Sequence, residues 1–415
     1  MINFDPGQTH VFTVRGETGR HNDKGNSVMS KWFRENAPVS PGALTEEFMR
    51  LKRGSVTRRH FLGVTGLGLA AAVLARQPGL FNSTAYAQED LGSTMSLATW
   101  PNYHDPATFE AFTAATGVAV EVNVFGSNEE MLERLKAGGM GWDLFVPTNY
   151  TISTYAGLGL IEPIDLSKVP NFDQKSENPR FTNEGIIDGK LYALPKNWGT
   201  TGIAVNSYKV KADVTSWKQF FEVAMTEADG RAMVHDYQLT AIGNALVSLG
   251  FSFNSVKPEE LAKAEELLLK VKPHLYAINS DYQPAMRASD AWMTMCWTND
   301  GAQLNRDIPE IHFTLGTDGG EIWSDFYAVP TSAANRPAGY ALLNFLMDPQ
   351  NAVREHIANG APTTDSRVIA LLPSEITGNR IVYPDEAALT PLEFGAAVTL
   401  TDPARAELMA RFKSA

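Results

Sequence analysis

Short apolar runs alternate with segments that carry helix-capping signals from residue 95 to residue 147, and this alternation limits the chain to few architectures. Asp105 is suited to cap a helix that begins at Pro106 and ends before Gly117. Valine then occupies every second position over 118–125, which is typical of a strand. The order strand, helix, strand, helix, strand predicts a parallel sheet with helices on its faces.

The remaining chain continues in the same style, without an internal repeat or a long linker. We therefore expect an α/β protein built of two lobes packed close together, each lobe a mainly parallel sheet flanked by helices. Further helices are predicted at 217–225, 238–249, 258–271, 338–347 and 351–358, and further strands at 198–206, 232–235, 292–297, 311–315 and 322–329.

Charge is distributed unevenly along the 415 residues, whose formal net charge is −12. Residues 1–87 contain 11 Lys and Arg against 6 Asp and Glu, a balance of +5, which leaves −17 for the remainder. Because an acidic surface repels phosphate backbones, we expect no nucleic-acid partner. The single cysteine, Cys296, excludes a disulfide framework and a thiolate zinc site, and we expect neither metal nor cofactor.

The basic leader contains a pattern that resembles a twin-arginine translocation signal. Arg58 and Arg59 precede an apolar run over 61–75, and Ala-Tyr-Ala at 85–87 has the small-x-small form that signal peptidase accepts. The run of about 15 residues is shorter than the roughly 20 of a membrane-spanning helix, and a membrane anchor is the alternative.

This resemblance predicts how the chain is processed. Residues 55–87 would form the signal peptide, and the mature protein would begin at Gln88 in the periplasm or an equivalent compartment. Residues 1–54 are expected to be disordered or untranslated, since Met29 and Met49 are both possible initiators.

Aromatic and acidic residues recur where the predicted strands end. In open parallel sheets, ligands bind outside the carboxyl ends of the strands. Ring faces attract ammonium groups and a carboxylate pairs their charge, so this mixture suits an organic cation, although aromatic walls also suit sugars. The candidate ligand-binding residues are Trp100, Tyr103, Thr148, Tyr150, Asp236, Tyr237, Trp297, Trp323 and Asp325.

Catalytic motifs find little support in the sequence. It contains no His-Glu-x-x-His, no phosphate-binding Gly-x-x-x-x-Gly-Lys loop and no Gly-x-Ser-x-Gly. Cys296 lies within an apolar run and is interpreted as a buried thiol. We therefore expect a binding protein rather than an enzyme. The alternative, an exported enzyme on the same scaffold, would have only Cys296 as a thiol nucleophile.

Seven segments of the chain resemble the spermidine/putrescine-binding periplasmic proteins, which supply polyamine ABC importers. The resemblance implies a two-lobed periplasmic-binding-protein fold of type II, with two hinge strands and a ligand enclosed between the lobes. It further implies a monomer that delivers a small organic cation to a membrane ABC permease. The segments are 100–103, 127–131, 142–150, 198–206, 297–299, 322–325 and 342–346.

The resemblance also implies roles for individual residues. Trp297 and Trp323 match the pair that sandwiches an alkyl chain, and Asp325 matches the carboxylate that pairs an ammonium end. One position departs from the family, because Thr240 stands where an acidic residue usually holds another amine. A mono-cationic amine, a betaine-like compound or an opine therefore stays an alternative ligand.

The lobes are expected to be discontinuous in sequence. The first lobe would comprise 88–203 and about 326–370, and the second 204–325 and about 371–415.

Overall fold

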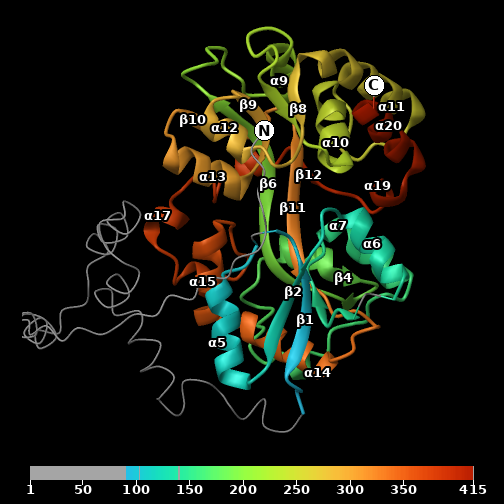
Figure 1. Cartoon of the computed structure of the whole chain (residues 1–415), viewed down its shortest axis with the longest axis vertical. Helices are drawn as coiled ribbons and strands as arrows, with labels where there is room; N and C mark the ends of the chain where they lie inside the picture. The colour runs from blue at the N-terminus through green and yellow to red at the C-terminus, as the bar shows by residue number, and fades with distance from the viewer. Residues whose placement is uncertain (1–89, 102, 139–140, 415) are drawn as a thin grey trace, which may run out of the picture. The chain divides into compact units, whose positions relative to one another are not determined.

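The computed structural model describes residues 90–101, 103–138 and 141–414. Its first sheet has three parallel strands in the order β2 (Ala119–Val124), β1 (Thr94–Thr99) and β3 (Leu144–Phe145). Helices α5 (Pro106–Thr116) and α14 (Arg336–Leu346) lie beside this sheet (Figure 1). Strand–helix–strand order therefore yields the parallel sheet that the sequence predicts.

The predicted capping signals at Asp105 and Gly117 are confirmed. The Asp105 side chain accepts a hydrogen bond from the backbone N–H of Ala107, and Gly117 ends α5 with a φ of 80°. Ser127 caps α6 (Asn128–Lys136) by accepting from the N–H of Glu130. The Glu130 carboxylate in turn accepts from the N–H of Gly126, at 2.7 Å. These bonds satisfy backbone groups that a helix end leaves without intrahelical partners.

The second sheet is larger and mixed. Its strands follow the order β12, β11, β6, β9, β7 and β8, with β10 paired to β6. Strand β6 runs antiparallel to β9, β10 and β11, whereas the pairs β7–β8, β7–β9 and β11–β12 are parallel. The prediction of a mainly parallel sheet holds for the first lobe only, because β6 enters the second sheet against its neighbours. The strand bounds are β6 Leu194–Asn206, β7 Ala232–Val234, β8 Leu275–Ile278, β9 Met293–Trp297, β10 Ile311–Thr314, β11 Gly320–Tyr327 and β12 Leu392–Phe394.

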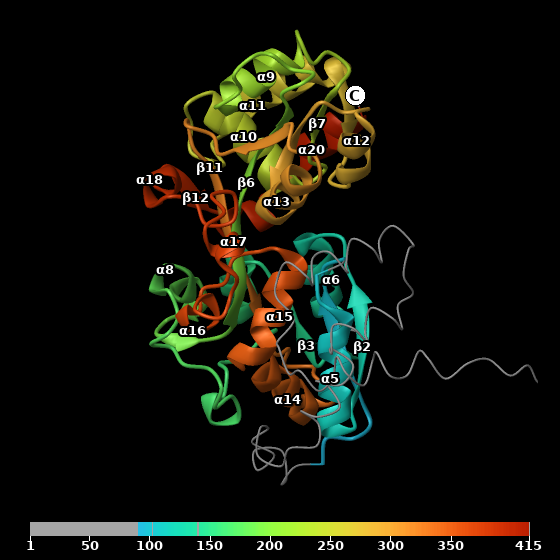
Figure 2. The same ribbon diagram turned by 90° about the vertical axis from the view of Figure 1, so that its left-hand side faces the viewer.

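Strands β6 and β11 connect the two sheets. They are the long central strands in Figure 2, with one group of helices at each end. They pair antiparallel from Leu194 opposite Tyr327 to Thr201 opposite Glu321. Isolated bridges, such as Phe145 with Ala328, link the end of β11 to the first sheet. We call the parts built on the first and second sheets the first and second lobe; the predicted residue boundaries between them stay a prediction.

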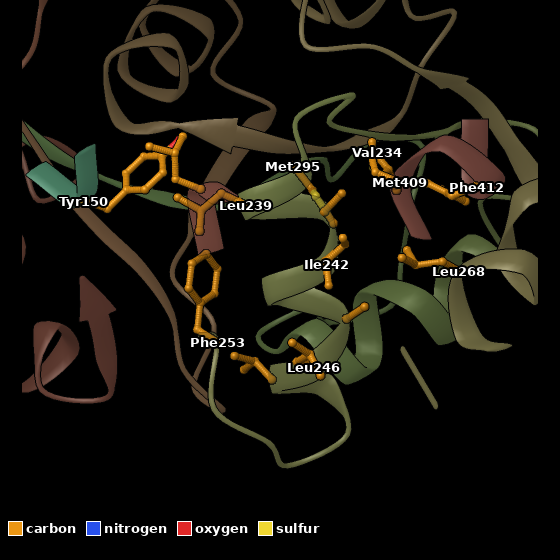
Figure 3. Packing of buried hydrophobic residues seen from close by; sticks show 14 of the residues in the cluster. Tyr150, Val234, Leu239, Ile242, Leu246, Phe253, Leu268, Met295, Met409 and Phe412 are labelled. Carbon is orange, nitrogen blue, oxygen red and sulfur yellow. The ribbon is translucent and has the colours of Figure 1, made fainter. Parts of the chain in front are cut away.

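Helix α10 (Gln238–Ser248) occupies the centre of the second lobe. Its residues Leu239, Ile242 and Leu246 point into a core with Phe253 and Met295 (Figure 3). The other helices of at least six residues in the described chain are α7 (Asn149–Gly157), α9 (Trp217–Ala224), α11 (Pro258–Val271), α12 (Gln283–Ala288), α13 (Thr298–Asp307), α15 (Pro349–Asn359) and α20 (Pro403–Ser414).

The predicted export signal over 55–87 and the leader over 1–54 lie outside the described residues. Among the helices that the structure describes, none combines the length and the apolar character needed to cross a membrane.

Candidate ligand-binding site

Asp325 is the centre of a buried polar cluster where β11 meets the first lobe. The Thr148 hydroxyl, just beyond β3, donates to Asp325 Oδ1 at 2.7 Å. The Tyr103 hydroxyl, beyond β1, donates to Asp325 Oδ2 at 2.5 Å. Burial raises the pKa of Asp325 to about 6, although both hydroxyl donors oppose this rise. Tyr103 and Thr148, which were predicted from two separate strand ends, therefore both lie in direct contact with Asp325.

Asn197, on β6, extends this cluster. Its Oδ1 lies 2.8 Å from the Tyr103 hydroxyl, while its Nδ2 is buried without a partner in the described chain. The single hydroxyl hydrogen of Tyr103 already serves Asp325. An Asn197 amide rotated by half a turn would donate to Tyr103 and give Nδ2 its partner. We therefore assign Nδ2 of Asn197 as the donor to Tyr103.

Lys196 places a buried ammonium group beside the same cluster. Its side chain is only 5% exposed, and Nζ lies 4.3 Å from the centre of the Tyr103 ring. Nζ has no hydrogen-bond acceptor among the described residues. Burial lowers the pKa of Lys196, while the negative charges of Glu355 and Asp325 oppose this shift. Sequence reasoning missed Lys196, because a single lysine in a strand normally indicates an exposed position.

Trp323 and Asp325 share one face of β11 with Glu321, since residues two apart on a strand point the same way. The Trp323 ring crosses over Gly199 of β6, where a side chain would collide with the indole. Trp323 is 7% exposed, and its Nε1 is buried without an acceptor in the described part of the chain. An aromatic side chain thus separates two carboxyl groups along one strand.

Glu321 is the second acidic residue on this face, and the sequence analysis did not identify it. It is 3% exposed and accepts a hydrogen bond of 2.5 Å from the Thr201 hydroxyl. Burial raises the pKa of Glu321 to about 7; the Thr201 bond opposes the rise and the charge of Asp325 adds to it. Glu321 directly precedes the strand predicted over 322–329, and its alternation with Trp323 and Asp325 was a usable signal.

Trp297 on β9 and Glu321 on β11 both lie opposite Thr201 of β6, so the three residues form one row across the second sheet. Its ring packs 4.5 Å from that of His235 and 6.0 Å from that of Tyr282, measured between centroids. Its backbone N–H donates to the Tyr282 hydroxyl at 2.8 Å. Trp297 is half-buried and packs against the core of the second lobe on one side.

Tyr237 connects the lobes. Its hydroxyl contacts the hydroxyl of Tyr150 and accepts a hydrogen bond of 2.9 Å from Asn128 Nδ2. Beside it, Gln238 Nε2 donates to Glu129 Oε1 at 2.7 Å. Burial raises the pKa of Tyr150 and Tyr237 well above the usual value, so both hydroxyls stay protonated. These contacts join the start of α10 to α6 and α7.

Two predicted residues stand apart from the polar cluster. Trp100 packs edge-on against Phe125, 4.6 Å between ring centroids, and makes no hydrogen bond through its buried indole N–H in the described chain. The side chain of Asp236 is 45% exposed and accepts two hydrogen bonds from Ser280, and Lys413 Nζ lies 4.0 Å away. The structure does not bring Asp236 together with Asp325.

Cys296 is fully buried, and burial raises the pKa of its thiol well above the usual value. A thiol kept protonated is a poor nucleophile. No group of three or more His, Cys, Asp or Glu side chains that could hold a metal ion occurs in the described residues.

Glu321 also predicts a pH dependence of stability. Its folded-state pKa of about 7 exceeds the ordinary 4.5, so the folded protein holds this proton more tightly. The resulting stabilisation is complete below pH 4.5 and is lost as the pH rises through 7, by about 3 kcal/mol. The variant Glu321→Gln lacks this loss. Measured by urea unfolding, its free energy of unfolding relative to that of the wild type should therefore rise by about 3 kcal/mol from pH 4.5 to pH 7. Parallel pH profiles for the two proteins would contradict this prediction.

Two lobes joined by crossing strands, with aromatic and acidic side chains gathered where they meet, define a solute-binding protein. The family model described as bacterial extracellular solute-binding protein matches residues 107–369. The chain belongs to this family, and among its members to the family of the spermidine/putrescine-binding periplasmic proteins. The predicted resemblance to these proteins is thereby confirmed. The predicted α/β periplasmic-binding-protein fold is confirmed by the similarity to solved structures of such proteins, with the second sheet mixed rather than mainly parallel.

The similarities extend over most of the chain. The spermidine/putrescine-binding periplasmic protein of Escherichia coli is 32% identical, over 76% of this chain and 89% of the relative. The putrescine/agmatine-binding protein of Pseudomonas aeruginosa is 27% identical, over 78% and 93%. The solved substrate-binding protein of a Streptococcus pneumoniae spermidine/putrescine ABC transporter is 26% identical, with a TM-score of 0.66 over 78% and 99%. The chain is thus a periplasmic or extracellular binding protein and not an enzyme.

Proposed function

We propose that the protein is the receptor of an ABC importer and binds a polyamine such as spermidine or putrescine between its lobes. The observation that carries this proposal is the Asp325 carboxylate, which is 6% exposed and fixed by Tyr103 and Thr148. No cationic side chain lies within 4.0 Å of it in the described chain. A buried carboxylate in this position can pair a ligand ammonium group, and the relatives' names supply the polyamine class.

Capture would proceed by closure of the lobes. The Tyr237–Tyr150 contact and the Gln238–Glu129 bond would part to admit the ligand and form again around it. Trp323 would cover the alkyl chain while Asp325 offsets the desolvation cost of an ammonium group. Of the nine predicted residues, we retain all but Asp236 in the proposed site, with Trp100 and Trp297 as apolar walls.

Export and delivery follow from the same proposal. The paired Arg58 and Arg59 and the Ala-Tyr-Ala site at 85–87 support passage through the twin-arginine pathway into the periplasm. The receptor would act as a monomer and hand the solute to a membrane ABC permease.

One observation favours a second candidate ligand. The Lys196 ammonium beside Tyr103 has no hydrogen-bond acceptor in the described chain. A solute that carries a carboxylate as well as an amine, such as an opine, could pair with both Lys196 and Asp325.

A thermal-shift screen of the purified protein tests the proposal. The panel would include spermidine, putrescine, agmatine, choline, betaine, opines and sugars. A ligand at a hundredfold excess over its Kd stabilises the folded state by about 2.7 kcal/mol, which should raise the melting temperature by a few degrees. Spermidine or putrescine should give the largest shift. A shift with sugars or anions alone would overturn the proposal, and a lead by opines would favour the second candidate.

A further inference from the structure

Glu321 is a buried carboxyl group to which the proposed function assigns no role. It is almost completely buried, and the hydroxyl of Thr201 is its one hydrogen-bond donor among the described residues. No cation of the described chain lies within 4.0 Å of its carboxylate. A carboxylate buried without a cation is costly, so such a group either keeps its proton or pairs with a cation that arrives from outside.

The place of Glu321 on the sheet indicates what that partner is. Glu321, Trp323 and Asp325 alternate along β11, and the register is regular from Glu321 to Asp325. The two acidic residues therefore point to the same face on either side of the indole. The residues opposite them on β6 are Thr201, Gly199 and Asn197. Because Gly199 has no side chain, the Trp323 ring lies directly over the backbone of β6 between the two carboxyl groups.

We propose that Glu321 is a second anionic subsite, which holds a further ammonium group of a ligand anchored at Asp325. This inference rests on the proposed function and specifies the ligand as a polyamine long enough to cross Trp323.

The distance between Glu321 and Asp325 along β11 favours a ligand of a particular length. Residues four apart on a strand are separated by about 13 Å at their Cα atoms. An extended chain advances about 1.1–1.2 Å per bond, so the terminal nitrogens of spermidine, nine bonds apart, span about 10 Å. The terminal nitrogens of putrescine, five bonds apart, span about 6 Å. Spermidine can bring an ammonium group near each carboxylate, whereas putrescine engages Asp325 alone.

The protonation of Glu321 gives the subsite a signature of its own. Its raised pKa of about 7 means that roughly nine-tenths of the free protein carries a proton there at pH 6. Pairing with an ammonium group requires the charged form, so binding releases this proton. The titratable groups that act on Glu321 in the described chain are Asp325 on β11 and Tyr237 before α10, and Tyr237 stays protonated.

Calorimetric titration of the purified protein with spermidine and putrescine tests the subsite. Glu321→Gln should weaken spermidine binding at least tenfold and leave putrescine binding within twofold of the wild type. Glu177→Gln is the matched control, because Glu177 is also buried, has a pKa raised to about 7 by burial and accepts a threonine hydroxyl bond, but lines a first-lobe cavity beside Thr364. This control should change neither affinity.

A measurement on the wild type needs no variant. At pH 6, titrations in buffers of different ionisation heat should show about one proton more released by spermidine than by putrescine. Equal proton release, or equal effects of Glu321→Gln on both amines, would overturn the subsite while leaving amine binding in place. Absence of amine binding by the wild type would instead overturn the proposed function, and the subsite with it.

Discussion

Asp325→Asn should weaken amine binding by roughly 2–5 kcal/mol, the usual effect of leaving one charge of a buried pair without its partner. This corresponds to a loss of about 30-fold to several thousand-fold in affinity. The asparagine keeps one acceptor oxygen for one of the two hydroxyls, Tyr103 or Thr148, and its amide nitrogen can donate to the oxygen of the other. The change therefore removes the charge and largely keeps the shape of the cluster. Calorimetric titration with spermidine and putrescine measures the effect, which should appear with both amines.

Asp236→Asn provides the matched control for this experiment. Both residues are aspartates that sequence reasoning assigns to the site, but Asp236 is bonded to Ser280 on the surface. Its substitution should leave the affinity unchanged. If Asp236→Asn weakened binding and Asp325→Asn did not, the carboxylate that pairs the ligand ammonium group would be Asp236 and not Asp325.

Glu355→Gln should lower the free energy of unfolding by about 3–5 kcal/mol, because it leaves the buried Lys196 without its main negative neighbour. Glu355 is 3% exposed and lies 2.7 Å from His104 Nδ1. Burial acts to raise its pKa, but the hydrogen bond from His104 and the charge of Lys196 outweigh this and hold it near 2. Urea unfolding at pH 7 measures the loss.

A second substitution separates the charge effect from general damage. Lys196→Met in the Glu355→Gln background removes the stranded ammonium group and should recover most of the lost stability. Lys196→Met alone should change stability little, since methionine fills a similar apolar volume. Additive losses in the double variant would show that the two residues do not form a coupled pair.

Local signals in the sequence were sufficient to predict the helices and strands on which the site residues lie. The N-cap at Asp105, the C-cap at Gly117 and the capping residue Ser127 define helix ends through bonds to immediate neighbours. Strand periodicity likewise places Trp323 and Asp325 on one face of β11. Because parallel strands end at one edge of a sheet, residues after β1 and β3 could be expected to meet.

Long-range packing decided which strand faces are buried and in which direction the strands of the second sheet run. The β2 valines alternate as in a half-buried strand, yet Val122 and Val124 are about half exposed because β2 is an edge strand. The mixed pairing of the second sheet arises because β6 crosses from the other lobe. Neither edge position nor strand direction is encoded in local periodicity.

The sequence by itself determined the α/β class, the capped helices and the strand ends at which aromatic and acidic residues gather. Only the tertiary structure joined Thr148 to Asp325 across 177 residues, turned Asp236 toward Ser280 and buried Lys196 and Glu321. The physical reason is that the cost of burying a charge, and the pKa it acquires, depend on neighbours that distant segments supply. Residue type and spacing identify a carboxylate, whereas only packing decides whether it faces water or can receive an amine.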